Sequence, residues 1–361
     1  MKECVDCSVL DDFARFLVVG KINVVPLFDR IKFNINEFCG DRYYYWDFKD
    51  AQSAREKIDN KFGGECKVDE KLMCFICEIY NNKKLNCAEK IIAFRLGISN
   101  SLSLSDVDEI NLSCFMINTW GGINTGAKNV KKCAEVVREV RKEGEDEVYG
   151  LLIEKIGNLK LVPSWSKVLS AIDCSKYYVY DSRISLVLRF LWSAYLKSEN
   201  KRIQNPFVFK AGKDDYKKVK ASQGRFATTC LPNVECLGNQ IDNDGNGCND
   251  KIREKSYRSY CYLINKIADL LIEERDFSIG LNCDLIRQVA ILSLNADINK
   301  LITCQMIEMA FFGLIGRDGA KVQKKTDYYF LRAGDKIKES IETPGFNIDN
   351  MKQLKVLLGL I

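Results

Sequence analysis

Two segments decide the fold: Leu161-Val162-Pro163-Ser164-Trp165-Ser166-Lys167-Val168-Leu169 and, a few residues later, Val179-Tyr180-Asp181-Ser182-Arg183-Ile184. Apolar residues at helical spacing precede the first segment, and Gly157 predicts the end of that helix. Ser164 is suited to cap the next helix, which we expect from about Trp165 to Ile172. The stretch therefore predicts a helix, a short hairpin, a second helix, a turn, and then Asp181 at the start of a third helix.

The helix that follows Asp181 has the clearest amphipathic pattern in the chain. From Ser182 to Leu196 the apolar residues recur at helical spacing and form one stripe: Ile184, Val187, Leu188, Leu191, Trp192 and Tyr195. Asp181 suits the N-cap or first turn of this helix, where the helix dipole stabilises a carboxylate. A catalytic aspartate in this place would cap the helix as well, so capping alone does not decide between the two roles.

Composition excludes several classes of enzyme. The 361 residues include 47% hydrophobic and 29% charged residues, as in ordinary globular proteins, but no histidine. Ser-His-Asp and Cys-His nucleophile systems, zinc hydrolases with histidine ligands, and any imidazole general base are therefore excluded. Catalysis must use carboxylates, lysine, tyrosine, cysteine or backbone groups.

The chain carries no pattern for export or membrane insertion. Its start, Met-Lys-Glu-Cys, lacks the apolar region of a secretory signal, and we find no apolar run long enough to span a bilayer. We therefore expect a cytoplasmic protein, and we expect most of the sixteen cysteines to be reduced core residues. Those within apolar helical patterns include Cys114, Cys133, Cys261 and Cys304.

The apolar spacing predicts a mainly α protein in four parts. Residues 1–83 mix aromatics with short apolar runs, so a small α+β part with a few strands is expected there. Residues 84–199 form a helical core, residues 200–255 a polar, basic insertion, and residues 256–361 a C-terminal helical region. The glycines of Trp120-Gly121-Gly122-Ile123-Asn124-Thr125-Gly126 predict a loop within the core.

Basic residues gather in two segments, residues 197–225 and residues 128–142. Between Lys197 and Arg225 there are nine Lys or Arg against three Asp or Glu, with aromatic residues between them. Basic residues interleaved with aromatics suit a polyanion with exposed bases, whereas the plainer alternative is a solvated loop and a solvated helix face. The predicted DNA-contacting residues are Lys128, Lys131, Lys132, Lys217, Lys218, Lys220 and Arg225.

The two quoted segments resemble the helix-hairpin-helix DNA glycosylases, in particular the branch shaped like 8-oxoguanine glycosylase. That family has Leu-Pro-Gly-Val-Gly-x-Lys-Val/Thr-Ala in its hairpin and Pro-Val-Asp-x-His/Arg-Val at its aspartate. Lys167 matches the family's Schiff-base lysine and Asp181 its catalytic aspartate, while Pro163 and Trp165 replace the hairpin glycines. A looser likeness to prokaryotic proteins of this shape covers residues 304–312. The resemblance implies a helix-hairpin-helix glycosylase-like fold.

Glycosidic cleavage suits these residue types. Breaking an N-glycosidic bond develops positive charge on the sugar, which a fixed carboxylate at Asp181 would stabilise. A lysine such as Lys167 can attack C1′ and form an imine that leads to strand cleavage. We expect Trp120, Trp165 and Arg183 to bind substrate. Each also has a structural alternative. Trp120 could be a core residue, Trp165 could pack within the hairpin, and Arg183 could form a surface ion pair.

Two further sequence patterns resemble metal-binding motifs but lack residues that such motifs normally contain. Cys4-x-x-Cys7 and Cys74-x-x-Cys77 have zinc-knuckle spacing, yet the second lies in an apolar run and neither pair has neighbouring glycines. Residues 242–247 match the start of a calcium loop, but Arg253 stands where a bidentate glutamate is required. We therefore expect no metal and no cofactor.

The leading hypothesis is a monomeric glycosylase that flips a modified base out of double-stranded DNA and cleaves its glycosidic bond. Lys167 would add AP-lyase activity. The resemblance makes an oxidised purine the default substrate, and the basic insertion would also suit a hypermodified base of foreign (phage) DNA. The alternatives are a non-catalytic nucleic-acid-binding protein on the same scaffold and a zinc-stabilised interaction module.

Overall fold

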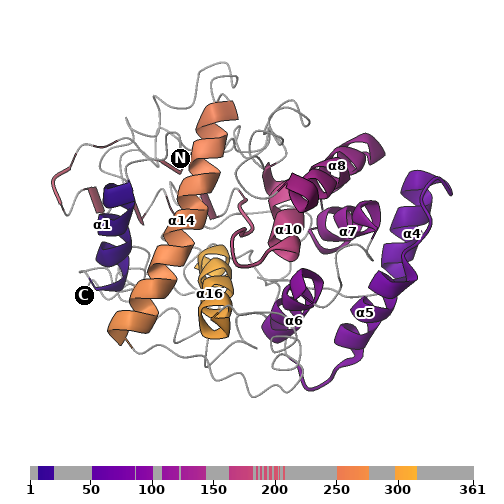
Figure 1. Cartoon of the computed structure of the whole chain (residues 1–361), viewed down its shortest axis with the longest axis horizontal. Helices are drawn as coiled ribbons and strands as arrows, with labels where there is room; N and C mark the ends of the chain where they lie inside the picture. The colour runs from indigo at the N-terminus through magenta and orange to yellow at the C-terminus, as the bar shows by residue number, and fades with distance from the viewer. Residues whose placement is uncertain are drawn as a thin grey trace, which may run out of the picture. The chain divides into compact units, whose positions relative to one another are not determined.

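The structure is a computed structural model, and it describes part of the chain. The described residues are 7–19, 51–85, 87–100, 108–121, 123–143, 162–181, 250–275 and 297–314, together with single positions between 184 and 207. All regular structure within these ranges is helical, which confirms the mainly α prediction (Figure 1). None of these helices has the length and apolar character needed to cross a membrane.

The described helices and their bounds are α1 (Cys7–Val18), α4 (Ala51–Phe62), α5 (Glu70–Asn81), α6 (Cys87–Asn100), α7 (Glu109–Cys114), the π-helix η2 (Phe115–Trp120), α8 (Ala127–Glu143), α10 (Val162–Ile172), α14 (Asp250–Arg275) and α16 (Ile298–Leu314). The described helices α6, α7, α8 and α10 lie within the predicted helical core 84–199, and α16 and most of α14 lie within the predicted helical region 256–361. The helix predicted to end at Gly157 lies outside the described residues.

Two expectations about local structure are not met at the residues that the structure describes. Strands expected in residues 1–83 do not occur at 7–19 or 51–85, and the run Phe16-Leu17-Val18 belongs to α1. Its apolar residues bury one face of a helix, which a short run cannot distinguish from a strand. Ser164 is not a helix cap, because α10 already begins at Val162. Pro163 suits this first turn, since its fixed φ matches a helix and its missing N–H leaves no bond unmade.

The described chain divides into two compact units. Unit 1 comprises residues 1–43, 181–277 and 306–361, and unit 2 comprises residues 44–180 and 278–305. α16 has residues in both ranges. The four parts predicted from the sequence remain a prediction.

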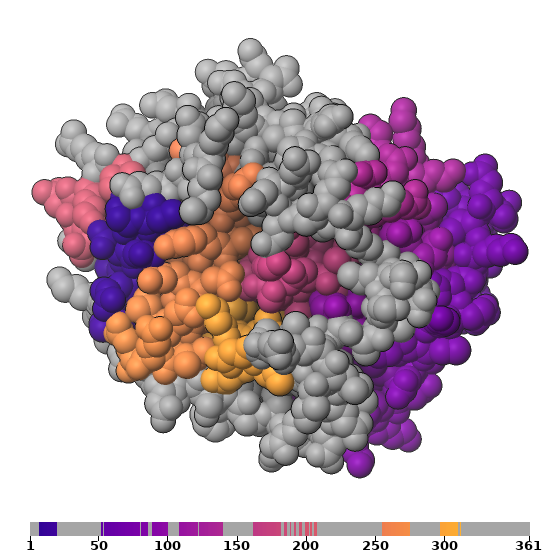
Figure 2. Space-filling model, in the orientation of Figure 1, coloured from indigo at the N-terminus to yellow at the C-terminus, as the bar shows by residue number. Residues whose placement is uncertain are grey.

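Unit 1 is built on the pair α1 and α14. The two helices lie side by side (Figure 1), and their side chains meet in the space-filling view (Figure 2). Arg15 forms an ion pair of 2.7 Å with Glu274, and the Tyr262 hydroxyl donates to Asp11 at 2.7 Å. The core holds a cluster of aromatic rings: Phe13, Trp192, Tyr195 and Phe207.

The amphipathic stripe after Asp181 belongs to this core. Ile184, Leu188, Leu191, Trp192 and Tyr195 are each at most 1% exposed. The predicted burial of the stripe is confirmed at these positions. Val187 lies outside the residues whose side chains are described.

Unit 2 is a cluster of helices around α10. That helix packs against α6, α8 and η2, while α7 packs against α8 and η2. Gly97 of α6 permits a close approach to α5, since an added Cβ would lie 2.0 Å from the Phe75 ring. Unit 2 contains Lys167, Trp120 and Trp165.

Candidate functional site

Lys167 is a buried lysine on α10. Its side chain is 7% exposed, and its Nζ donates to the carbonyl oxygen of Pro163 at 2.8 Å. Neighbouring residues on the same helix, Trp165, Val168 and Leu169, are at most 1% exposed. Lysine is seldom buried without a specific role or partner, because removing an ammonium group from water is costly.

Gly121 provides the space for the Lys167 stem. A Cβ added at Gly121 would lie 2.7 Å from Lys167 Cδ and 2.7 Å from the carbonyl oxygens of Met116 and Ile117. Two of these three neighbours are backbone atoms, which cannot move without disturbing the helix. The close packing of Lys167 against the end of η2 therefore requires glycine at this position.

The π-helix η2 ends at Trp120, and the next residue, Gly121, lies against Lys167. Its last turn is held by a hydrogen bond from Gly121 N to Met116 O at 3.0 Å and another from Ile123 N to Ile117 O at 2.9 Å. Single π turns are rare and occur frequently at functional sites. The predicted loop thus begins one residue later than expected, because Trp120 ends the helix.

The guanidinium group of Arg95 lies over the ring of Trp120. The arginine belongs to α6, is 0% exposed, and its Cζ is 5.3 Å from the centroid of the Trp120 ring. Trp120 itself is half-buried. This distance is within the range of a cation–π interaction. Two buried cations, Arg95 and Lys167, therefore contact the adjacent residues Trp120 and Gly121.

Two lysines of α4 hold the same loop from another side. Lys61 Nζ donates to the side-chain oxygen of Asn118 and to the carbonyl oxygen of Thr125, and Lys57 Nζ donates to the backbone oxygen of Asn118 at 3.2 Å. Asn118 Oδ1 also accepts from Thr125 N at 3.3 Å. Burial lowers the pKa of Lys61, and Lys57 acts in the same direction while Cys114 opposes it. These contacts join Asn118 of η2 to Thr125 and to α4.

Ser166 ties α10 to the segment before Asp181. Its hydroxyl accepts from Tyr180 N at 3.2 Å and lies 3.4 Å from the Tyr180 carbonyl oxygen, to which it donates. Ser166 directly precedes Lys167, and Tyr180 directly precedes Asp181. The backbone leading into Asp181 is thus bonded to the helix that carries Lys167.

Asp181 caps the helix that follows it. Its Oδ1 accepts from Ile184 N at 3.1 Å, and its backbone oxygen accepts from Ser185 N at 3.0 Å. The side chain is half-buried. This geometry confirms that Asp181 caps the helix.

The other predicted site residues are placed differently. Trp165 is 1% exposed and lies in the interior of unit 2, where it fills the core. Lys131 forms an ion pair of 2.7 Å with Glu65, Lys128 is exposed, and Lys132 is half-buried. The remaining candidates lie outside the described residues: Arg183, Lys217, Lys218, Lys220 and Arg225.

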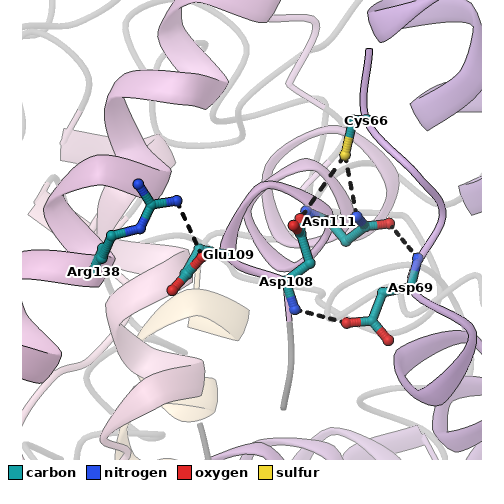
Figure 3. A network of polar contacts seen from close by, with 6 residues as sticks. All are labelled: Cys66, Asp69, Asp108, Glu109, Asn111 and Arg138. Carbon is teal, nitrogen blue, oxygen red and sulfur yellow. Dashed lines mark hydrogen bonds and ion pairs between the residues drawn. The ribbon is translucent and has the colours of Figure 1, made fainter. Parts of the chain in front are cut away.

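A second polar cluster in unit 2 is structural (Figure 3). Asp69 caps α5 by accepting from Leu72 N at 3.0 Å, and its other oxygen accepts from Asp108 N at 2.7 Å. Asp108 in turn caps α7, and Asn111 donates to it and accepts from Asp69 N at 2.9 Å. The Asp69 carboxylate accepts from backbone N–H groups at the starts of α5 and α7, so the cluster joins the two helices.

Most of the cysteines within the described residues are buried. Cys114, Cys133, Cys261 and Cys304 are buried free thiols, as predicted. Cys7 and Cys74 are exposed, Cys77 is half-buried, and Cys4 lies outside the described residues. Within the described ranges no group of three or more Cys, Asp or Glu is arranged to hold a metal ion. The calcium-like segment at 242–247 falls outside these ranges.

Sequence reasoning missed Arg95, Lys57, Lys61 and Asn118. One signal was present for Arg95, because a single arginine interrupts the apolar run Ile91-Ile92-Ala93-Phe94-Arg95-Leu96. Lys57 and Lys61 stand one helical turn apart on α4, a spacing that places both on one face. Nothing in the sequence indicates that this face meets Asn118.

Comparison with known proteins found no matching family model, no matching curated protein and no matching solved structure.

Proposed function

We propose that this protein is a DNA N-glycosylase that excises a modified base, with Asp181 as its essential carboxylate and Lys167 as an imine-forming amine. The observation that carries the proposal is the buried Lys167, packed against Gly121 next to Trp120. Lysine supplies a nucleophilic amine, and Trp120, the residue before Gly121, is a half-buried aromatic side chain of the kind on which a flipped base can stack. The resemblance of the two quoted segments to the glycosylases assigns Asp181 its role.

The proposed hydrolytic step needs only a carboxylate and water. The glycosidic bond breaks as the base leaves with the bonding electrons and takes up a proton. Asp181 stabilises the positive charge that develops at C1′ and the ring oxygen, and a water oxygen then bonds to C1′. No step requires histidine, of which the chain has none.

The proposed lyase step uses Lys167. Its nitrogen, deprotonated at the moment of attack, bonds to C1′ as the base departs. The C1′–O4′ bond then opens, O4′ takes up a proton from the attacking nitrogen, and a C1′ imine remains. Water then takes a proton from C2′ of this imine, the C3′–O bond breaks as the 3′ phosphate leaves with the bonding electrons, and the strand is cleaved.

The role of Asp181 is tested by an Asp181→Asn substitution. The variant keeps an oxygen that caps the helix, so the fold is expected to persist while formation of alkali-labile abasic sites falls by at least about a hundredfold. Asp173→Asn is the matched control, since Asp173 lies in the turn just before and accepts from Ser175 N at 3.0 Å. Full activity of Asp181→Asn on modified DNA would end the proposal.

The role of Lys167 is tested by trapping. Borohydride reduces an imine between Lys167 and C1′ to a stable amine, which links the protein to DNA. The adduct is expected with the natural chain and with Lys176→Gln, a control at an exposed lysine, and is expected to vanish in Lys167→Gln. Abasic-site formation without any adduct would restrict the activity to hydrolysis.

A further inference from the structure

Helix α5 carries two cysteines that stand one helical turn apart, Cys74 and Cys77. The apolar run around them predicts two core thiols, but in the structure Cys74 is exposed and Cys77 is half-buried. Within the described residues no third cysteine or carboxylate joins them to hold a metal ion. The pair is therefore a dithiol that a molecule in solution meets first at Cys74.

A helix brings two thiols at this spacing within reach of each other. With a rise of about 1.5 Å per residue, the Cα atoms of residues i and i+3 lie about 5 Å apart. Disulfides join Cα atoms that are about 4.4–6.8 Å apart, so the backbone of α5 allows a bond between Cys74 and Cys77. The Cβ atoms of such residues start about 5–6 Å apart in a helix, whereas a disulfide brings them to about 3.8 Å. Closing the bond therefore tightens this turn of α5.

The two residues inside the turn oppose this tightening. Ile76 is 0% exposed, and the Phe75 ring lies so close to Gly97 of α6 that an added Cβ there would meet the ring at 2.0 Å. Phe75 also stacks on Phe94 of α6, with 5.8 Å between the ring centroids. A disulfide in this turn forms against the packing of α5 on α6. Strained or exposed disulfides are the readily reduced ones, so this bond is reversible.

We propose that Cys74 and Cys77 form a redox-active pair that exchanges with small-molecule disulfides of the glutathione class. Exposure assigns the roles: Cys74 meets the incoming disulfide, and Cys77 resolves the mixed disulfide that results. The inference is independent of the proposed function. Failure of either one leaves the other unchanged, because base release and thiol exchange are measured separately.

The exchange proceeds in two balanced steps. The Cys74 thiolate attacks one sulfur of oxidised glutathione, the bond between the two glutathione sulfurs breaks, and one glutathione leaves as a thiolate. The Cys77 thiolate then attacks the Cys74 sulfur, the internal disulfide forms, and the second glutathione leaves. The two protein thiols lose two electrons, which reduce the glutathione disulfide to two thiols. The protons given up by Cys74 and Cys77 end on these two leaving groups.

The experiment uses the full chain and a peptide that reports on this pair alone. The folded protein is incubated with oxidised glutathione, quenched with acid, alkylated and digested with trypsin. Cleavage after Lys71 and Lys83 releases residues 72–83, in which Cys74 and Cys77 are the only cysteines. Mass spectrometry over a time course then measures the reduced peptide, its internal disulfide and its glutathione adducts.

The peptide from the natural chain is expected to form the internal disulfide, and an excess of reduced glutathione should restore both thiols. Cys77→Ser should stop at a glutathione adduct on Cys74. In Cys74→Ser the adduct on Cys77 should form at least about tenfold more slowly, because that thiol is half-buried. Cys133→Ala, at a buried thiol of α8, is the control and should leave the behaviour of the peptide unchanged.

A natural chain whose peptide stays reduced, or carries glutathione without an internal disulfide, would overturn the inference. Equal adduct rates in Cys74→Ser and Cys77→Ser would overturn the assignment of the two roles. The natural chain supplies the order of events if a variant does not fold, since the adduct on Cys74 must then precede the internal disulfide. An adduct that appears first on Cys77 would contradict the proposal.

Discussion

The stem of Lys167 lies against Gly121 so closely that no side chain fits between them. An added Cβ would stand 2.7 Å from Lys167 Cδ, and equally near two carbonyl oxygens of the π-helix. The glycine joins the buried amine of α10 to the loop that carries Trp120. Substitution at Gly121 therefore tests whether this contact matters for activity.

Gly121→Ala is expected to displace Lys167 and strain the end of η2. Overpacking of this kind costs about 1–3 kcal/mol of stability, and the borohydride adduct should fall by at least about tenfold. Gly126→Ala is the matched control, because a Cβ there meets no atom within 4 Å. Equal trapping by both variants would show that the position of Lys167 is unimportant.

Ser166→Ala should loosen the backbone that leads into Asp181. It leaves the buried N–H of Tyr180 without its hydroxyl acceptor, a loss worth about 1–3 kcal/mol in urea unfolding. Base release should slow without vanishing, since no reacting group is removed. Ser170→Ala removes only a bond from a hydroxyl to Lys167 O, at 2.8 Å, and should retain the natural rate. A rate for Ser166→Ala equal to that of the control would contradict the proposed positioning.

Asp69→Ala should destabilise the contact between α5 and α7. The substitution removes the acceptor for Leu72 N and the acceptor for Asp108 N, so we expect a loss of about 2–3 kcal/mol, measured by urea unfolding. Glu70→Ala removes an exposed ion pair with Arg55 and should cost less than about 1 kcal/mol. Similar losses in the two variants would refute the assignment of the cluster as a joint between helices.

Cys133 should make the fold sensitive to alkaline pH. Burial raises the pKa of its thiol from 9.0 to about 12, so the thiol of the unfolded chain ionises at lower pH than that of the folded chain. Stability from this residue is complete below pH 9.0 and is lost as the pH rises toward the folded value. The loss amounts to about 1 kcal/mol in the first pH unit above the unfolded pKa. In Cys133→Ala that part of the pH dependence should disappear, whereas Cys7→Ala, at an exposed thiol, should leave it intact.

Much of the helical architecture was accessible from the sequence. Apolar spacing predicted a helical core over residues 84–199, in which α8 (Ala127–Glu143) lies, and the predicted stripe from Ile184 to Tyr195 is buried at every position described. These features follow from local periodicity, which depends only on the alternation of buried and exposed faces. The start of α10 was misplaced because Pro163 was assigned to a hairpin and not to the first turn of a helix.

The residues that surround Lys167 could not be predicted from the sequence. The spacing of residues 115–120 does not distinguish a π turn from an α turn, and the contacts of Arg95 with Trp120 and of Lys61 with Asn118 join segments far apart in the chain. Such contacts depend on how helices pack and leave no periodic signal. Lys167 and Trp120 were each predicted from local sequence, whereas the contact of Lys167 with Gly121, the residue after Trp120, came from the fold.

The most direct test of the central claim is the mass-spectrometric detection of free bases. Oxidised, alkylated and hypermodified DNA are incubated separately with the natural chain and with Asp181→Asn. We predict that the natural chain releases a modified base and leaves an equal number of abasic sites or cleaved strands, whereas Asp181→Asn binds the same DNA and releases no base. Absence of any released base with the natural chain, or equal release by the two proteins, would contradict the account.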